Sequence, residues 1–215
     1  MAVSMRSTRI HERLQSLSCC CLQPPRSKSE KRRSSSFSTG ATTENIVFLL
    51  GFSDVGKSSI AERHERHQYT EGHKDYIERV YSCSFVRADG ISHRVTVADT
   101  PASTFFPREL NVQIIRGKGF LVVFAVDNAE SFQEANRLLN LIQSIRGDSV
   151  PIILVGNKAD LEERQVASQE AQELANEYSN CKYIEASART SYNVQEAFLC
   201  LFELGHFLKT PTSVH

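Results

Sequence analysis

Residues 51–58 read GFSDVGKS. It matches the pattern G-x-x-x-x-G-K-[ST] and lies between the apolar run Ile46–Leu50 and a helical stretch, which is the context that a phosphate-binding loop requires. The glycines let the backbone wrap around phosphate oxygens, and successive amides at a helix N-terminus supply positive potential. We predict that Lys57 reaches the β- and γ-phosphates and that the Ser58 hydroxyl binds Mg²⁺. The loop predicts a nucleoside triphosphate but does not name its base.

Further apolar runs follow the loop along the chain. Short continuous runs predict buried strands at 94–98, 119–126 and 151–155, with a shorter candidate at 183–185. Between them, helical periodicity predicts helices at 131–145, 168–179 and 194–208. Strands that alternate with helices predict the α/β class, with a mostly parallel central sheet and helices on both faces. In such folds ligands bind at the carboxyl ends of the strands, where the loop 51–58 lies.

The composition limits the function classes. The chain has 215 residues, of which 40% are hydrophobic and 23% charged, so it can bury a sizeable core. Its formal net charge is zero, which argues against a general nucleic-acid coat protein. The charge is divided unevenly, because residues 1–43 hold eight basic and two acidic residues. This segment therefore carries +6 and residues 44–215 carry −6.

The chain divides into three parts. Residues 1–43 are rich in Ser, Arg and Lys, and we expect a disordered basic extension. Residues 44–209 form the predicted domain, and 210–215 a short tail. No apolar run approaches the roughly 18 residues of a membrane-spanning helix. The six cysteines follow neither a disulfide nor a metal-ligand spacing, and no secretory signal precedes them, so we expect a reducing, cytoplasmic environment.

Two later motifs name the base. GNKAD at 156–160 and EASA at 185–188 each follow a predicted strand. Here the sequence resembles the Ras branch of small GTPases, whose guanine motifs are N-K-x-D and S-A. A carboxylate at Asp160 can accept both N1–H and N2–H of guanine, whereas adenine offers no such pair of donors. The resemblance covers about residues 45–209 and includes GFLVVFAVDNAESF (119–132) and ILVGNKADL (153–161). It implies a P-loop small G domain.

The resemblance also implies ligands and contact residues. The expected ligands are GTP or GDP with Mg²⁺, and Ser58 and Asp99 are the expected metal residues. Asn157 and Lys158 would bridge the base and the loop, the Ala188 amide would donate to guanine O6, and Tyr69 would cover the guanine ring. The full set expected to contact nucleotide is Gly51, Ser53, Asp54, Val55, Gly56, Lys57, Ser58, Ser59, Tyr69, Asn157, Lys158, Asp160, Ser187 and Ala188.

Four positions around the expected γ-phosphate depart from the family pattern. Tyr76 stands where the switch I threonine would bind Mg²⁺, and Ala102, after Pro101, replaces the switch II glycine. Ser103 replaces the glutamine that orients the attacking water and is too short for that role. Ser53 replaces a P-loop glycine and crowds the space for an activating arginine. No catalytic residue is therefore intact, and we predict a GTP hydrolase with impaired catalysis.

The helix after the loop also looks unusual. Over residues 59–67 only Ile60 and Ala61 are clearly apolar, so we expect weak docking of this helix and lower nucleotide affinity. Its histidines, His64 and His67, with His73 beyond it, could suggest a metal site. Because charged residues are interleaved with them, a solvated face is the preferred interpretation.

The expected partners are effector or regulatory proteins rather than nucleic acid. Glu78 and Tyr81 match the family's effector loop and, with the switch II segment, would form the contact surface of a monomer. Two functional hypotheses remain open: a slowly cycling signalling GTPase and a non-cycling pseudo-GTPase scaffold. An ATP-dependent P-loop enzyme is third, disfavoured by Asp160.

The N-terminus suggests a membrane anchor. A weak basic amphipathic pattern precedes Cys19, Cys20 and Cys21, which could be palmitoylated, and the basic run 28–33 could attract anionic lipid. The C-terminal residues 209–215 carry no C-a-a-X box, and Ala2 excludes myristoylation. The plasma membrane is the location this favours. A plain disordered tail and, less strongly, a mitochondrial transit peptide are the alternatives. Serines 34–36 after basic residues could accept a phosphate that weakens membrane attraction.

Overall fold

The computed structural model describes residues 45–69, 79–86, 92–102 and 107–205. Its strands form one six-stranded sheet in the order β2-β3-β1-β4-β5-β6. All neighbouring strands are parallel except β2, which pairs antiparallel with β3. The strands are β1 (Asn45–Gly51), β2 (Arg79–Val86), β3 (Ser92–Asp99), β4 (Gly119–Ala125), β5 (Ile152–Asn157) and β6 (Cys181–Glu185).

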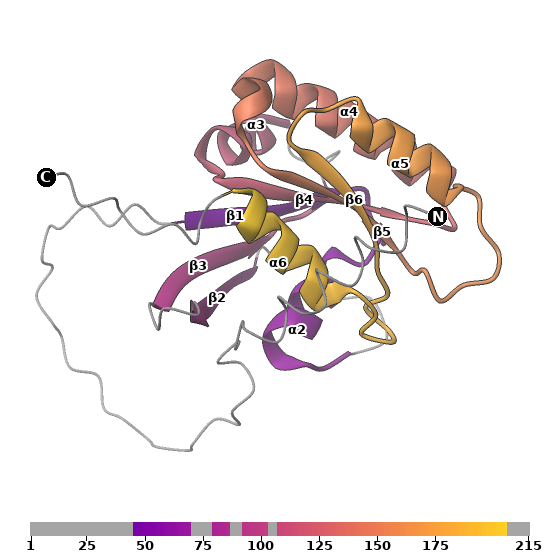
Figure 1. Ribbon diagram of the computed structural model, residues 1–215, viewed down its shortest axis with the longest axis horizontal. Coiled ribbons are helices and arrows are strands. Elements are labelled where there is room, and N and C mark those ends of the chain that lie inside the picture. Colours follow the sequence, from indigo (N-terminus) through magenta and orange to yellow (C-terminus); the bar gives the residue numbers. More distant parts are fainter. Residues whose placement is uncertain (1–44, 70–78, 87–91, 103–106, 206–215) are drawn as a thin grey trace, which may run out of the picture.

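Helices cover both faces of the sheet. They are α2 (Lys57–Arg66), α3 (Pro107–Arg116), α4 (Ala129–Arg146), α5 (Ser168–Asn176) and α6 (Val194–Leu204), with a 3₁₀ turn at Gly147–Ser149. Figure 1 shows α3, α4 and α5 on one face and α2 and α6 on the other. This arrangement confirms the predicted α/β fold.

The central strand β4 explains why its sequence is a continuous apolar run. All seven of its residues are buried, because helices cover both of its faces. Phe120 and Phe124 belong to the core under α3, α4 and α5. Leu121 and Val123 point the other way, into the core shared with α2 and α6. Alternate side chains of β4 therefore contribute to two hydrophobic cores, one on each face of the sheet.

Two elements were not predicted from the sequence. Strand β2 pairs with β3 along its full length, from Arg79 opposite Asp99 to Val86 opposite Ser92. Helix α3 buries Leu110 and Ile114, which have the i, i+4 spacing of one helical face. The Arg146 side chain fixes the end of α3, since its Nη1 donates to the carbonyls of Ile114, Ile115 and Gly117 at 2.7–3.0 Å. The spacing in α3 was a usable signal, but the helix is short and its apolar face is narrow.

The expectation that α2 docks weakly is wrong. Half of its ten residues are buried, and three of these are polar: Lys57, Glu62 and His64. The imidazole of His64 lies flat on Phe198 of α6, with ring centroids 3.7 Å apart and planes at 14°. Its Nδ1 is 2.7 Å from Gln195 Oε1, and Gln195 Nε2 donates to the His64 carbonyl at 3.1 Å. The stacking and hydrogen bonds of His64 therefore hold α2 in place, although the helix has few aliphatic side chains.

The solvated-face interpretation of the histidines fails for His64 for the same reason. His64 has no exposed surface, and its burial lowers its pKa to about 4. His67 is exposed as expected, and His73 lies outside the described residues. Within the described ranges, no group of three or more potential metal-ligating side chains occurs.

The segment 1–43, which holds Cys19, Cys20 and Cys21, and the segment 210–215 lie outside the described residues, so their predicted properties stay predictions. In the part of the chain that is described, no helix is long and apolar enough to cross a membrane. Cys181 and Cys200 are free thiols there, and burial raises the pKa of Cys181 to about 12.

Candidate nucleotide-binding site

The phosphate-binding loop connects β1 to α2 and depends on two glycines. At Gly51, a Cβ atom would lie 2.2 Å from the Val123 carbonyl oxygen of β4. At Gly56, φ is +90° and a Cβ would lie 2.3 Å from Asn157 Nδ2. Between them, Asp54 also has a left-handed backbone, with φ of 60°. Larger residues at either glycine would push the loop off the sheet, so the glycines set its shape.

The Lys57 side chain folds back onto the backbone of the phosphate-binding loop. Its Nζ donates to the carbonyls of Gly51 at 3.1 Å and Phe52 at 2.6 Å. Burial lowers the pKa of Lys57 to about 8, against the opposing pull of Asp99 and Asp54. The ammonium is thus held against the loop backbone, and a bound anion would raise its pKa again.

The N-terminus of α2 is open to an anion. Gly56 occupies its N-cap position, no side chain among the described residues caps its first turn, and no acidic residue lies in that turn. The first N–H groups of the helix and the loop amides therefore have the arrangement that binds phosphate elsewhere.

The carboxyl end of β3 places an acid beside this loop. Asp99 is 2% exposed, and its charge acts on the Lys57 ammonium. The next residue, Thr100, donates its hydroxyl to the Leu49 carbonyl at 2.7 Å and so ties the end of β3 to β1. A carboxylate and the half-buried Ser58 hydroxyl are hard oxygen donors, which fits the donor chemistry that Mg²⁺ requires.

Asn157, at the end of β5, joins the phosphate loop to the predicted base loop. Its Nδ2 donates to the Val55 carbonyl at 2.7 Å, and its Oδ1 accepts from the Ala188 amide at 3.1 Å. Asn157 is 2% exposed, so both hydrogen bonds are shielded from water. One buried side chain therefore fixes the relative positions of two loops that lie far apart in the sequence.

Asp160 is anchored with its carboxylate exposed. Its Oδ1 accepts from the Ser187 hydroxyl at 2.6 Å, and Ser187 Oγ in turn accepts from the Thr190 amide at 3.1 Å. One oxygen of the carboxylate is thus held by the protein, while Asp160 as a whole remains exposed to a ligand. This orientation suits a ligand that offers two adjacent donors.

Lys158 forms a different contact from the one expected. Its Nζ pairs with Asp127 Oδ2 at 3.2 Å, in the loop after β4. The Lys158 backbone has φ of 63°, which turns the chain between Asn157 and Asp160. Asp127 was missed from the sequence, although its place after a buried strand was a usable signal.

Tyr69 lies at the end of the described segment after α2 and is 36% exposed. The Arg63 guanidinium carbon lies 5.7 Å from the centroid of the Tyr69 ring. Arg63 also contacts the loop after β6, which the sequence did not predict. No local signal could have revealed this contact, because its acceptors are backbone carbonyls about 125 residues further along the chain.

The switch positions are only partly described. Ala102 is 4% exposed, whereas Tyr76, Glu78 and Ser103 lie outside the described residues. Tyr81 is 4% exposed and packs in the core with α2 and α6, so its expected place on an exposed effector surface is wrong. Its neighbour Val80 is 65% exposed instead, because alternate residues of edge strand β2 face opposite sides.

The start of β2 is fixed to α2 by an ion pair. Arg79 Nη1 lies 3.0 Å from Glu62 Oε1, and the Glu62 side chain is only 10% exposed. The pair joins the exit of the expected effector loop to the helix that follows the phosphate loop.

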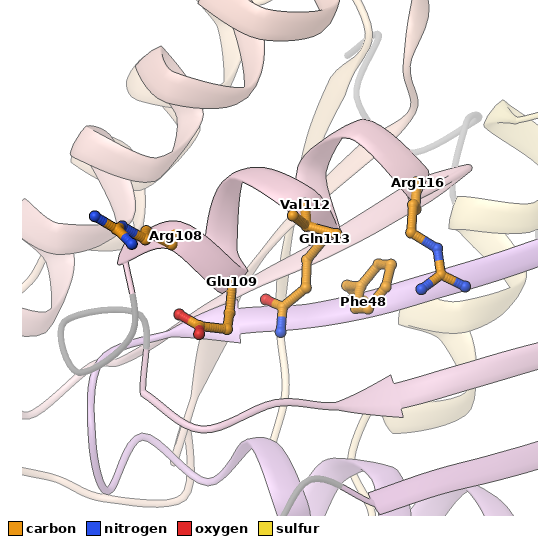
Figure 2. Close-up of a pocket in the computed structure, with 6 residues that line it drawn as sticks. All are labelled: Phe48, Arg108, Glu109, Val112, Gln113 and Arg116. Carbon is orange, nitrogen blue, oxygen red and sulfur yellow. The ribbon is translucent and has the colours of Figure 1, made fainter.

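A separate hollow of about 300 Å³ lies between α3 and β1. Figure 2 shows its lining side chains, all from α3 except one from β1. None of them belongs to the predicted nucleotide site; they are Phe48, Arg108, Glu109, Val112, Gln113 and Arg116.

The loop between β1 and α2, with Lys57 inside it and Asp99 beside it, defines a P-loop protein of the α/β class. The Ras family model matches residues 46–204. Mouse GTP-binding protein Rit2 is 35% identical over 163 residues, which cover 75% of this chain and 74% of Rit2. Human GTP-binding protein Di-Ras1 is 34% identical over 160 residues, covering 74% and 80%. Human GTP-binding protein Rhes is 35% identical over 173 residues, covering 74% and 63%. This chain belongs to the Ras family.

Proposed function

We propose that this protein binds GTP and GDP with Mg²⁺, hydrolyses GTP slowly, and acts in signalling as a small G protein of Ras type. The observation that carries the proposal is the bridge made by Asn157 between Val55 and Ala188. It positions a phosphate loop and a base loop for one ligand that has both parts. The exposed carboxylate of Asp160, anchored by Ser187, can accept the two adjacent N–H donors of guanine. We therefore propose that the base of this ligand is guanine.

The metal part of the proposal rests on Ser58 and Asp99. Both are oxygen donors at the mouth of the phosphate loop, as Mg²⁺ prefers. When bound there, Mg²⁺ would neutralise charge on the phosphates. Lys57 would act from inside the loop on the same phosphates.

Slow hydrolysis follows from the residues at four positions. Ser103 cannot reach as far as an amide side chain to position water, and Ala102 follows a proline, which stiffens the segment. Ser53 and Tyr76 carry larger side chains than the family pattern has at these positions. The binding residues keep their family identities, so binding should survive where hydrolysis is weak.

Two measurements test this function. The nucleotide that co-purifies should be GDP or GTP, as identified by chromatography after denaturation. Single-turnover hydrolysis of bound GTP should be slow and should respond weakly to Ras-type activators. Purification with adenine nucleotide would refute guanine binding, and hydrolysis at the rate of an activator-stimulated Ras protein would refute the impaired site.

A non-cycling scaffold is the second candidate, and the Glu62–Arg79 ion pair favours it. The pair ties the start of β2 to α2 through side chains of the protein alone. A switch segment fixed in this way would present one surface in both nucleotide states. Hydrogen exchange of residues 79–86 in the GDP-bound and GTP-analogue-bound protein separates the candidates, because a scaffold shows no difference and a cycling switch does.

We also propose that the N-terminal segment attaches the protein to the plasma membrane through Cys19, Cys20 and Cys21. Palmitoyl chains on these cysteines and the basic run 28–33 would supply the two signals that stable anchoring requires. Changing all three cysteines to serine should release the protein from the membrane fraction of cells. A matched change of Cys181 and Cys200 to serine should leave it there. Retention of the triple variant would contradict the proposal, and import into mitochondria would favour the transit-peptide alternative.

A further inference from the structure

We propose that Arg63 is a positioning residue for the guanine base, holding the Ala188 loop and Tyr69 in place from helix α2. The inference rests on the proposed binding of guanine nucleotide. It adds a residue that is not among the expected nucleotide contacts and that the motifs of the sequence did not identify.

The Arg63 guanidinium uses all three of its nitrogens. Its Nε donates to the Ala188 carbonyl at 2.9 Å, and its Nη2 donates to the Arg189 carbonyl at 2.9 Å. Its Nη1 donates to the carbonyl of His67, at the C-terminal end of α2, at 3.0 Å. Two parallel bonds thus fix the base loop, and the third fixes the side chain to its own helix.

The acceptors are neutral, so the charge of Arg63 is not paired by these bonds. It lies over the Tyr69 ring at 5.7 Å, within the range of a cation–π contact. Tyr69 is the aromatic expected to cover the guanine ring. A single planar group therefore orders both the loop at the base edge and the ring at the base face, which the point charge of a lysine could not do.

Ala188 is held on both sides of its Cα atom. Its N–H donates to Asn157 Oδ1 at 3.1 Å, and its C=O accepts from Arg63. The preceding residue, Ser187, holds the Asp160 carboxylate at 2.6 Å. Guanine O6, to which the family resemblance assigns the Ala188 amide, would share this N–H with Asn157 Oδ1. The direction of the amide therefore depends on a residue in α2.

Arg63 is not needed to dock α2. The helix is already fixed by buried Ile60 and Ala61 and by the His64 contacts with Phe198 and Gln195. Two of the Arg63 bonds go to backbone carbonyls of the base loop rather than to side chains that pack α2. A variant at this position should thus fold and alter base recognition selectively.

The test compares Arg63→Ala and Arg63→Lys with Arg66→Ala. Arg66 is a matched control on the same helix, with its side chain 62% exposed and an ion pair to the adjacent Glu65 at 3.3 Å. Release of fluorescent GDP should be about tenfold faster in Arg63→Ala, as expected for the loss of hydrogen bonds to a charged donor, and unchanged in Arg66→Ala. Arg63→Lys should fall between the wild type and Arg63→Ala.

A second readout separates positioning from general loosening. In 6-thio-GDP a weakly accepting sulfur replaces O6, while N1–H and N2–H remain. The wild type should prefer GDP to 6-thio-GDP, and this preference should shrink several-fold in Arg63→Ala because the Ala188 amide loses its direction. A uniform loss of affinity for both nucleotides would overturn the inference, as would full rescue by lysine. Failure of the wild type to bind GDP would instead refute the proposed function.

Discussion

Gly56 and Asn157 approach each other so closely that a Cβ atom on Gly56 would lie 2.3 Å from Asn157 Nδ2. The same nitrogen donates to the Val55 carbonyl at 2.7 Å. The phosphate loop is therefore packed directly against the side chain that also holds the base loop. A substitution that moves either loop should therefore also displace the other loop through Asn157.

Gly56→Ala should abolish tight nucleotide binding. The added methyl group must displace Asn157, and the residue must keep φ at +90°, which L-residues rarely adopt. Gly147→Ala is the control, because Gly147 has φ of +63° but nothing within 4 Å of its Cβ position. The control should lose about 1 kcal/mol of stability and no GDP affinity. Equal GDP affinities in the two variants, measured by titration calorimetry, would show that the contact with Asn157 is unimportant.

Asp160→Asn should exchange guanine for xanthine. The asparagine amide can donate to the additional oxygen of xanthine, whereas it repels the N2–H donors of guanine. We expect GDP affinity to fall about 100-fold or more and affinity for xanthosine diphosphate to rise. Displacement of fluorescent nucleotide measures both. Undiminished GDP binding would mean that Asp160 is not the residue that recognises the base.

Stability should fall as the pH drops below the ordinary pKa of histidine, and His64 should be a cause. Burial lowers its pKa from 6.5 to about 4 in the folded protein, with the Gln195 hydrogen bond opposing and His67 adding to the shift. Protons therefore bind the unfolded chain first. The stability that neutral His64 contributes is complete above pH 6.5 and is lost as the pH falls toward 4.

His64→Leu should flatten this dependence. Between pH 7.5 and pH 5, the wild type should lose about 2 kcal/mol more than the variant in urea denaturation, since carboxylates titrate equally in both. His67→Leu is the matched control, because His67 is exposed. Parallel pH profiles for the wild type and His64→Leu would place the titrating group elsewhere.

Restoring the family residues at one switch position and one phosphate-loop position should restore hydrolysis. The double variant Ser103→Gln and Ser53→Gly returns the water-positioning amide and removes a side chain from the loop. The single-turnover rate should rise at least about tenfold if these positions limit it. Ser144→Gln, an exposed change on α4, should leave the rate unchanged. An unaltered rate in the double variant would place the limit at Tyr76 or Ala102.

The sequence alone predicted the strands of the parallel part of the sheet, because β1, β4 and β5 are apolar runs buried on both faces. It missed β2 and α3, where the apolar signal is short and only one face is covered. It placed Tyr81 on the surface, although the side-chain alternation of an edge strand turns this residue inward and Val80 outward. A sequence motif identifies a residue, but the side of the sheet on which its side chain lies depends on how the strands pair.

The sequence determined the class of ligand. Each motif consists of contiguous residues, so GFSDVGKS predicts the phosphates and NKAD predicts the guanine base from the sequence alone. The contacts between these motifs became visible in the folded chain. Arg63 and His64 looked like members of a charged, solvated helix, yet Arg63 meets carbonyls about 125 residues away and His64 stacks on Phe198. Backbone acceptors and ring stacking leave no mark in the local sequence, because any residue supplies a carbonyl and only folding brings it within reach.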